Sequence, residues 1–348
     1  MSESTRFDAF RALCLARFRE FYREPEVVFW GFVFPILLAV ALGLAFRNRP
    51  PETLSVMVVE GESSGEAIRA LAGSPLLKAK AGSAEEAAQA LRLGKVEVVV
   101  APGPSGYEYR LDPSRPEALV ARARVDDALQ RAAGRRDPVT TREVTVTEPG
   151  GRYIDFLVPG IIGMNLMSAG MWGMGFVLVD MRIKKLLKRL LATPLRRADF
   201  LLAQMTTRTF LTFVEVSLVL LFARLAFHVP VRGSVGAVLF VGMVGALVFS
   251  GLGLLVGSRA TRIEAVTGLM NLVMVPMFIA SGIFFSSDRF PDSLQPLVRA
   301  LPLTALNDAL RAVILEGATL ASQGPRLLLL GAWGAVSFLL GLRLFRWS

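Results

Sequence analysis

The sequence predicts an all-α membrane protein with six transmembrane helices, an inserted extracytoplasmic α/β domain and an N-terminal interfacial helix. Hydrophobic residues make up 53% of the 348 residues and charged residues only 20%, below the roughly 25% of ordinary soluble domains. Long uncharged runs recur along the chain, and the polar stretch 47–155 interrupts them. So many apolar residues also exclude an intrinsically disordered chain.

Six segments are predicted to cross the bilayer, because a helix needs about 20 apolar residues to span roughly 30 Å of hydrocarbon. They are 27–46, 156–179, 210–227, 233–258, 265–287 and 327–342. The third segment contains Glu215 and Arg224, and the last is short. Arg343 and Arg346 extend the last one, because long basic side chains reach the headgroups from within the bilayer.

Residues 47–155 are predicted to form an inserted α/β domain between the first two spans. Basic and acidic residues balance there, and short β-rich segments alternate with helical ones, a pattern typical of α/β domains. Strands are expected at 54–59, 96–101, 107–111 and 143–147, and helices at 64–72, 84–93 and 116–133.

The distribution of Lys and Arg predicts the orientation in the membrane. Basic residues concentrate in 1–26 and 180–208, and short loops rich in Lys and Arg stay in the cytosol. Both termini are therefore expected in the cytosol and the α/β domain outside, in the cell (inner or plasma) membrane. The loop 180–208 carries much of the net charge of +10, so the charge does not indicate a nucleic-acid surface.

The first 26 residues are predicted to form an amphipathic helix. Phe7, Phe10, Phe18 and Phe21 recur at helical spacing together with Cys14, while arginines occupy other faces. Such a helix lies in the membrane plane with its phenylalanines in the acyl boundary. A plain lipid anchor would show the same pattern.

The basic loop after the second span is predicted to form a short rigid helix over 181–194. Its leucines fall on one face, its lysines and Arg189 on the other, and Pro194 ends it. A helix of this kind transmits force from a soluble partner. The other interpretation is a positively charged loop lying on anionic lipid.

Glu215 is the only acidic residue well inside a predicted span, and an intramembrane ionisable group indicates function by default. Its partner is expected to be Arg208, about two turns earlier on a helix, or a group on a neighbouring helix. A structural hydrogen bond or a misplaced span boundary would also explain Glu215. Asn165 and Asn271 are further polar candidates along a transport pathway. Gly253-x-x-x-Gly257 is a close-contact motif, expected to pack inside one subunit.

The segment 286–321 lies outside the predicted spans, yet it is still apolar and prolines punctuate it. Two short helices, at 294–301 and 306–315, are expected to re-enter the membrane, with Pro302, Asn307 and Arg311 as their notable residues. Broken backbone is tolerated at membrane depth where protein buries it. A pair of interfacial helices is the other interpretation.

Several motifs of catalysis and cofactor binding do not occur in the sequence. It contains no G-x-x-x-x-G-K-[ST], no G-x-S-x-G and no H-E-x-x-H. With one cysteine and one histidine, it offers no multi-cysteine or His-rich metal site. We therefore expect neither a bound cofactor nor a catalytic residue in this chain.

Five stretches together resemble the permease subunits of type-2 ABC transporters, in the group with a large outside domain between the first two spans. Residues 153–176 resemble the second span of that family, and 190–204 follow at the expected distance. Residues 275–285 with 301–311 resemble the fifth span and the re-entrant helices, and 23–35 resemble the start of the first span.

The resemblance implies that two such subunits, identical or similar, form the transmembrane pathway. It also implies a separate P-loop ATPase that binds ATP and Mg²⁺ and docks on the cytosolic face, with 6–23 as the connecting helix. The family often has an acidic stretch containing Gly-Thr where this sequence reads RIKKLLKR. By similarity, the residues of the coupling helix that contact the ATPase are Arg182, Lys185, Leu187, Lys188, Leu190, Leu191, Thr193 and Pro194.

The sequence therefore predicts the permease of an ABC exporter. It would move a hydrophobic substrate, such as a drug, a lipid or a natural product, out of the cytosol or inner leaflet by alternating access. Two other hypotheses remain open at this point. One is a membrane-embedded enzyme that modifies lipids with Glu215 or Asp155 as acid or base, and the other is a sensor whose outside domain binds a ligand.

Overall fold

The computed structural model describes residues 3–47, 53–103, 106–139, 141–142, 150–191 and 197–345. The chain divides into two compact units. One, Asn48–Thr145, is here named the α/β unit, and the other, Met1–Arg47 with Val146–Ser348, the helical unit.

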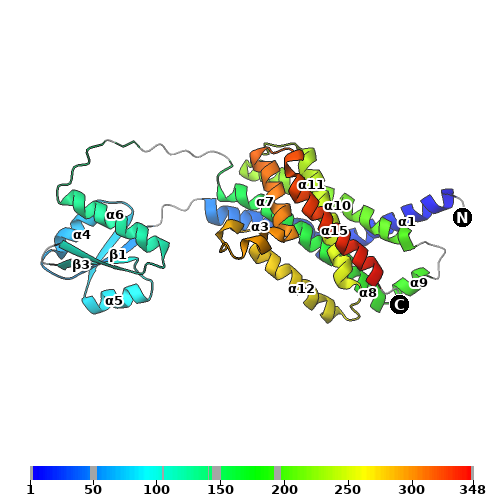
Figure 1. Cartoon of the computed structure of the whole chain (residues 1–348), viewed down its shortest axis with the longest axis horizontal. Helices are drawn as coiled ribbons and strands as arrows, with labels where there is room; N and C mark the ends of the chain where they lie inside the picture. Colours follow the sequence, from blue (N-terminus) through cyan, green and yellow to red (C-terminus); the bar gives the residue numbers. More distant parts are fainter. Residues whose placement is uncertain are drawn as a thin grey trace. The chain divides into compact units, whose positions relative to one another are not determined.

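The α/β unit is built on a four-stranded sheet in the order β2-β1-β3-β4. β1 runs parallel to both β2 and β3, and β4 runs antiparallel to β3. Helices α4 and α6 pack on one face of the sheet and α5 on the other (Figure 1). The elements are β1 Leu54–Val59, α4 Ser64–Ala72, β2 Leu77–Gly82, α5 Ala84–Arg92, β3 Val98–Gly103, β4 Gly106–Leu111 and α6 Pro116–Ala132.

Alternation along the strands explains why this sheet carries helices on both faces. Val56 and Val58 are buried under α4 and α6, while Met57 and Val59 contact α5, as expected from the two-residue period of a strand. The sequence analysis missed β2, because its sequence LKAKAG has few residues of high β-propensity. The predicted strand at 143–147 lies outside the described residues.

The helical unit begins with a helix that precedes the first apolar run and continues as a bundle of long helices. Its first elements are α1 Glu3–Arg23, α2 Pro25–Val28, the π-helical η1 Phe29–Val33 and α3 Phe34–Arg47. The rest are α7 Tyr153–Met171, the π-helical η2 Trp172–Phe176, α8 Val177–Ile183, α9 Leu186–Leu191, α10 Arg197–Phe227, α11 Val235–Gly257, α12 Ile263–Ala280, η3 Ser287–Arg289, α13 Gln295–Ala300, α14 Pro302–Arg311, the π-helical η4 Ala312–Glu316, η5 Ala321–Gln323 and α15 Gly324–Leu344.

Six helices of the described residues are long and apolar enough to cross a membrane, as the sequence predicted. Two boundaries differ most from the prediction. The third span begins at Ala203 rather than at 210, which places Arg208 inside it. The fifth ends at Ala280 rather than at 287, because Gly282 adopts φ 70° and turns the chain. The six spans are Pro25–Ala45, Tyr153–Ile183, Ala203–Phe227, Val235–Gly257, Ile263–Ala280 and Ala321–Leu344.

The core of the helical unit lies along α7 and α11. α11 packs against both α7 and α15, and the three lie side by side (Figure 1). A Cβ added at Gly253 would be 2.8 Å from the Met171 carbonyl oxygen, and one at Gly257 would be 2.7 Å from that of Gly175. The prediction that these two glycines pack within one subunit is therefore confirmed.

Candidate functional site

The basic loop between the second and third spans is not one continuous helix, so that prediction is wrong. α8 ends before α9 begins because Lys185 adopts φ 57°, the left-handed conformation that commonly ends helices. The Lys185 N–H donates a hydrogen bond to the Arg182 carbonyl oxygen at 3.0 Å. Thr193 and Pro194 lie outside the described residues, as do the side chains of Leu190 and Leu191.

Arg182, expected to contact a partner, binds backbone carbonyls of its own chain. Its Nη1 donates to the carbonyl oxygens of Gly257, at 3.2 Å, and of Ala260, and its Nη2 donates to that of Ser258 at 3.0 Å. The last carbonyls of a helix lack partners within it, and a cation there opposes the helix dipole. Arg182 therefore clamps α8 to the C-terminal end of α11.

The three other predicted ATPase-contact residues whose side chains are described divide into an inner and an outer group. Leu187 is 1% exposed and packs in a cluster that includes Leu178 and Leu254. Lys185 and Lys188 are exposed. The segment is thus anchored from within by Leu187 and presents two lysines outward.

α1 packs against α10 rather than standing apart from the bundle. The Phe18 and Phe210 rings meet edge to face with centroids 5.2 Å apart, and Phe21 meets Phe32 at 5.8 Å. Phe10 is half-buried, and the side chain of Phe7 lies outside the described part of the chain. At least two of the four phenylalanines therefore contact protein, although the prediction placed them in the acyl boundary.

Glu215 and Arg208 form a buried ion pair within α10, as the sequence predicted. Arg208 Nη2 lies 2.7 Å from Glu215 Oε2, and Nη1 lies 3.2 Å from Oε1. The Glu215 side chain is 1% exposed and that of Arg208 13%. Two parallel N–H···O bonds give such a pair a fixed geometry, and the pair is neutral as a unit.

Polar side chains also bind the π-helical segments next to this pair. A π-turn disrupts the regular i→i−4 hydrogen-bond ladder of an α-helix. Asn165 Nδ2 donates to the Gly31 carbonyl oxygen of η1 at 3.0 Å, and Gln204 Nε2 donates to that of Gly173 in η2 at 3.1 Å. Glu215 also approaches η1, because a Cβ added at Gly31 would be 3.5 Å from its Oε1.

Gln204, Arg208, Thr212 and Glu215 follow one another along a single face of α10, here named the polar stripe. Three of its buried atoms have no hydrogen-bond partner within the described residues: Gln204 Oε1, Arg208 Nε and Thr212 Oγ1. An unpaired buried polar atom costs roughly 1–3 kcal/mol. The stripe therefore holds unused hydrogen-bonding capacity inside the helical unit.

The sequence analysis missed Gln204 and Thr212, although a signal for them was present. Both lie at helical spacing from Arg208. Because the third span was expected to begin at 210, Gln204 was assigned to the basic loop and the stripe was divided between two segments. Asn271, the other asparagine candidate, is exposed on α12 and is not part of the buried stripe.

The segment after α12 folds back into the helical unit and is pinned there by two predicted residues. Asn307 Nδ2 donates to the Ser281 carbonyl oxygen at 2.7 Å, and Arg311 Nη2 donates to that of Gly282 at 2.7 Å. α14 begins with Pro302 in its first turn and packs against α7, α11 and α15. Protein thus surrounds this broken backbone, the condition under which a segment can re-enter a membrane.

Asp155, considered above as a catalytic acid or base, is engaged in holding helix ends. It is fully buried and accepts hydrogen bonds from the Gly150 N–H at 2.8 Å and from the Arg152 guanidinium at 2.8 and 2.9 Å. Arg152 also donates to the Phe227 carbonyl oxygen at 2.9 Å, at the end of α10. The pair therefore joins the start of α7 to the end of α10.

Six candidate spans are the pattern of a multi-pass membrane protein. The chain matches the ABC-2 family transporter protein family over residues 25–343 and belongs to that family. It is an ABC transporter permease. Permeases of this kind are not enzymes themselves, because a partner subunit carries the ATPase activity.

Curated relatives agree with this assignment. The chain is 23% identical over 337 residues to the probable multidrug ABC transporter permease YbhS of Escherichia coli, covering 88% of each chain. It is 27% identical over 192 residues to ABC transporter G family member 20 of Dictyostelium discoideum, covering 55% of this chain and 26% of that protein. Nodulation protein J of Bradyrhizobium diazoefficiens is 26% identical over 171 residues, covering 48% of this chain and 64% of that protein.

Proposed function

We propose that this chain is the permease subunit of an ATP-driven exporter that moves a hydrophobic substrate out of the cytosol or the inner leaflet. The observation that carries the proposal is the segment α8–α9, where exposed lysines stand on backbone that is clamped to the core. This chain performs no covalent chemistry in the proposal. A separate P-loop ATPase binds ATP and Mg²⁺.

The contacts of Arg182 supply a route for force. A partner that pulls on Lys185 and Lys188 moves α9. α8 moves with it, because Leu187 of α9 packs against the side chains of α8 in one buried cluster. Arg182 then carries the displacement to the end of α11 through three carbonyl contacts. α11 packs against α7 and α15, so a displacement of the loop is transmitted to these helices of the bundle.

The polar stripe of α10 is proposed to line the transport pathway and to contact water in one of the two alternating-access states. Its three unpartnered atoms gain hydrogen bonds when the helices separate and water or substrate enters, which favours the open state. The Arg208–Glu215 pair keeps the stripe electrically neutral, so a hydrophobic substrate meets no net charge there. Only a partner with different affinity for the two states can drive the exchange between them.

The functional unit is proposed to be a homodimer, or a heterodimer with a similar permease, in the cell membrane. The termini face the cytosol and the α/β unit faces outward, in line with the basic residues of 1–26 and 180–208. α12 exposes an apolar face that either lipid or a second permease covers. Its exposed residues are Leu269, Leu272, Val275 and Ile279.

A charge-reversal experiment tests the proposed coupling. The chain is reconstituted with its ATPase in proteoliposomes, and ATP-dependent movement of rhodamine 6G serves as the hydrophobic probe. Lys185→Glu/Lys188→Glu should lower transport roughly tenfold, as expected when about 1.4 kcal/mol of contact energy is lost. Lys78→Glu/Lys80→Glu is the matched control, because these lysines are exposed on β2 of the α/β unit.

Unchanged transport in the loop variant would contradict the proposed coupling, since neither lysine is buried and folding should not suffer. An equal loss in the control variant would show that surface charge alone governs the assay. Transport by the chain without any ATPase would contradict the proposed function as a whole.

A further inference from the structure

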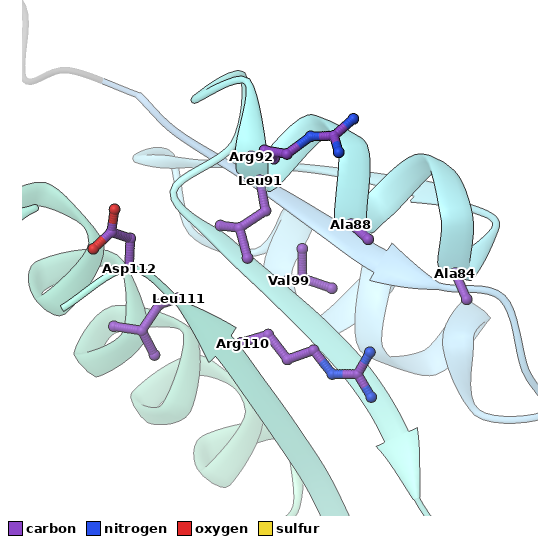
Figure 2. A pocket seen from close by; sticks show the side chains of 8 residues that line it. All are labelled: Ala84, Ala88, Leu91, Arg92, Val99, Arg110, Leu111 and Asp112. Atoms are coloured by element: carbon purple, nitrogen blue, oxygen red, sulfur yellow. The ribbon is translucent and has the colours of Figure 1, made fainter.

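One face of the sheet in the α/β unit is only partly covered. α5 packs on β1 and β3, and on this side it leaves the edge strand β4 open. A cavity of about 380 Å³ lies between α5 and β4 (Figure 2). Ligand pockets are typically about 300–1,000 Å³, so this one has room for a small organic molecule.

The floor and one wall of this cavity are apolar. Val99 of β3 is 2% exposed, and Leu91 is half-buried beside it. Ala84 and Ala88 lie one turn apart on α5, and their short side chains leave the wall open (Figure 2). An apolar molecule of matching size would cover surface that is now wet, which is favourable by roughly 25 cal/mol per Å².

The rim adds two guanidinium groups, from Arg92 at the end of α5 and Arg110 on β4 (Figure 2). Arg110 uses its Nε to donate to Glu108 Oε1 at 2.8 Å, and the structure shows no bond from its Nη groups to any described residue. Arg92 likewise has no hydrogen bond or ion pair among the described residues. Donors for an anion are therefore available at the rim.

Asp112 is the one carboxylate in the lining, and a local turn engages it. Its Oδ1 accepts hydrogen bonds from the Ser114 hydroxyl at 2.7 Å and from the Ser114 N–H at 2.9 Å. The Ser114 hydrogen bonds lower the pKa of Asp112 below its usual value. Asp112 stays ionised in the turn after β4, and the Glu108 carboxylate pairs with Arg110, so the opening offers an anion guanidinium N–H donors rather than a net positive charge.

We propose that this groove binds a small amphiphilic anion, with a carboxylate or sulfonate group attached to an apolar body. The planar guanidinium fork matches the geometry of such anions, and the apolar body fits against Val99 and Leu91. The cavity is too small for a whole phospholipid, so the ligand is a freely soluble molecule. The inference stands apart from the proposed function, because binding here needs neither ATP nor a second subunit.

The test measures binding to the full chain in lipid nanodiscs by the fluorescence anisotropy of pyrenebutyrate. Its trimethylammonium analogue serves as the matched cation, and empty nanodiscs give the background. Arg92→Gln/Arg110→Gln removes the charges, and Ala88→Phe fills the cavity without charge change. Arg69→Gln is the control, because Arg69 lies on α4, which packs on the opposite face of the sheet.

We expect saturable binding of pyrenebutyrate that weakens at least tenfold in both groove variants and is unchanged in Arg69→Gln. The cationic analogue should show no saturable binding. Equal binding of the cation would overturn the proposed charge selectivity. Binding that survives both groove variants would place the probe elsewhere and overturn the proposal, as would the absence of saturable binding in the unsubstituted chain.

Discussion

α7 and α12 are similar as sequences and very different in their surroundings. Both are apolar helices with an internal proline, and both qualify as membrane spans. α7 is buried on nearly every side, whereas α12 leaves a whole face of large apolar residues exposed. A Cβ added at Gly163 of α7 would collide with Asn307, whereas a Cβ added at Gly268 of α12 would meet no atom within 4 Å.

This difference shows what hydropathy does and does not measure. An apolar helix is equally compatible with lipid and with a protein interior, so mean hydropathy cannot distinguish the two positions. Small residues at close contacts, and polar side chains that find partners, mark the side that faces protein. The buried side of the helical unit is therefore expected to be sensitive to substitution and the exposed side of α12 to tolerate it.

The largest effect is expected from Arg208→Ala. The substitution leaves Glu215 buried without its counter-charge, and breaking a buried ion pair in this way costs about 3–5 kcal/mol. Thermal unfolding of the detergent-solubilised chain, followed by tryptophan fluorescence, measures the loss. Asn271→Ala on the exposed face of α12 is the control and should change stability by less than about 0.5 kcal/mol.

The double variant Arg208→Ala/Glu215→Ala sharpens the same test. It removes the stranded charge and should recover part of the loss, because the pair is neutral as a unit. A single variant as stable as the unsubstituted chain would show that Glu215 finds another partner or takes up a proton. Equal losses of stability in Arg208→Ala and Asn271→Ala would contradict the distinction between the buried side of the helical unit and the exposed side of α12.

Gly163→Ala is expected to give the next largest effect. A Cβ at this position would clash with Asn307 Oδ1, so the Asn307 side chain or α14 must shift, and overpacking of this kind costs about 1–3 kcal/mol. Unfolding temperature and protease resistance of 302–311 should both fall. Gly268→Ala is the matched control, and it should be neutral or stabilise the helix by about 0.5–1 kcal/mol. Equal outcomes for the two alanines would refute the assigned packing of α7.

Lys185→Gly is expected to give a smaller effect of opposite sign. The left-handed conformation of Lys185 costs a non-glycine residue about 1–2 kcal/mol, and glycine removes this cost. Lys188→Gly, one turn away inside α9, should instead destabilise by about 1 kcal/mol. Thermal unfolding of both variants compares the two positions. A loss of stability in Lys185→Gly would mean that α8 and α9 are continuous in solution.

The smallest effect at neutral pH concerns the α/β unit. Burial, reinforced by the hydrogen bond from Tyr109 to Asp126, raises the pKa of Tyr109 to about 12. The unfolded value is about 10, so the contribution of Tyr109 to stability is complete below pH 10 and is lost as the pH rises toward 12. Absorbance at 295 nm should show a step near pH 12 that Tyr109→Phe removes. If Tyr109→Phe instead removed absorbance near pH 10, that result would contradict the half-buried position of this ring.

Much of this architecture follows from the sequence because membrane physics is strict. An apolar run must form a helix in lipid, which fixes the six spans, and a buried acid needs a counter-charge, which identified Arg208 as the partner of Glu215. The alternating valines of 54–59 likewise identified the central strand β1. In each of these cases the local pattern is enough.

The rest depended on tertiary contacts that no local pattern contains. The conformation of Lys185 is decided at the contact between α8 and α11. The periodic leucines of the loop carry no sign of this contact, and they therefore predicted a single helix that is too long. The edge strand β2 is stabilised by its pairing with β1, which its own sequence does not show. Its lysines also make the segment look unlike a strand. Arg182 was expected, by similarity to the family, to contact the ATPase, whereas its carbonyl partners lie in its own chain, more than seventy residues away in the sequence.

Crosslinking from the basic loop tests most directly whether a separate ATPase drives this chain there. A photo-reactive amino acid replaces Lys188 in the full chain, which is co-expressed with a candidate P-loop ATPase, and the same amino acid replaces Lys78 as the control. The proposed coupling predicts a crosslink to the nucleotide-binding subunit from position 188 and none from position 78. A crosslink from 78 but not from 188, or from neither position in a complex that hydrolyses ATP, would contradict it.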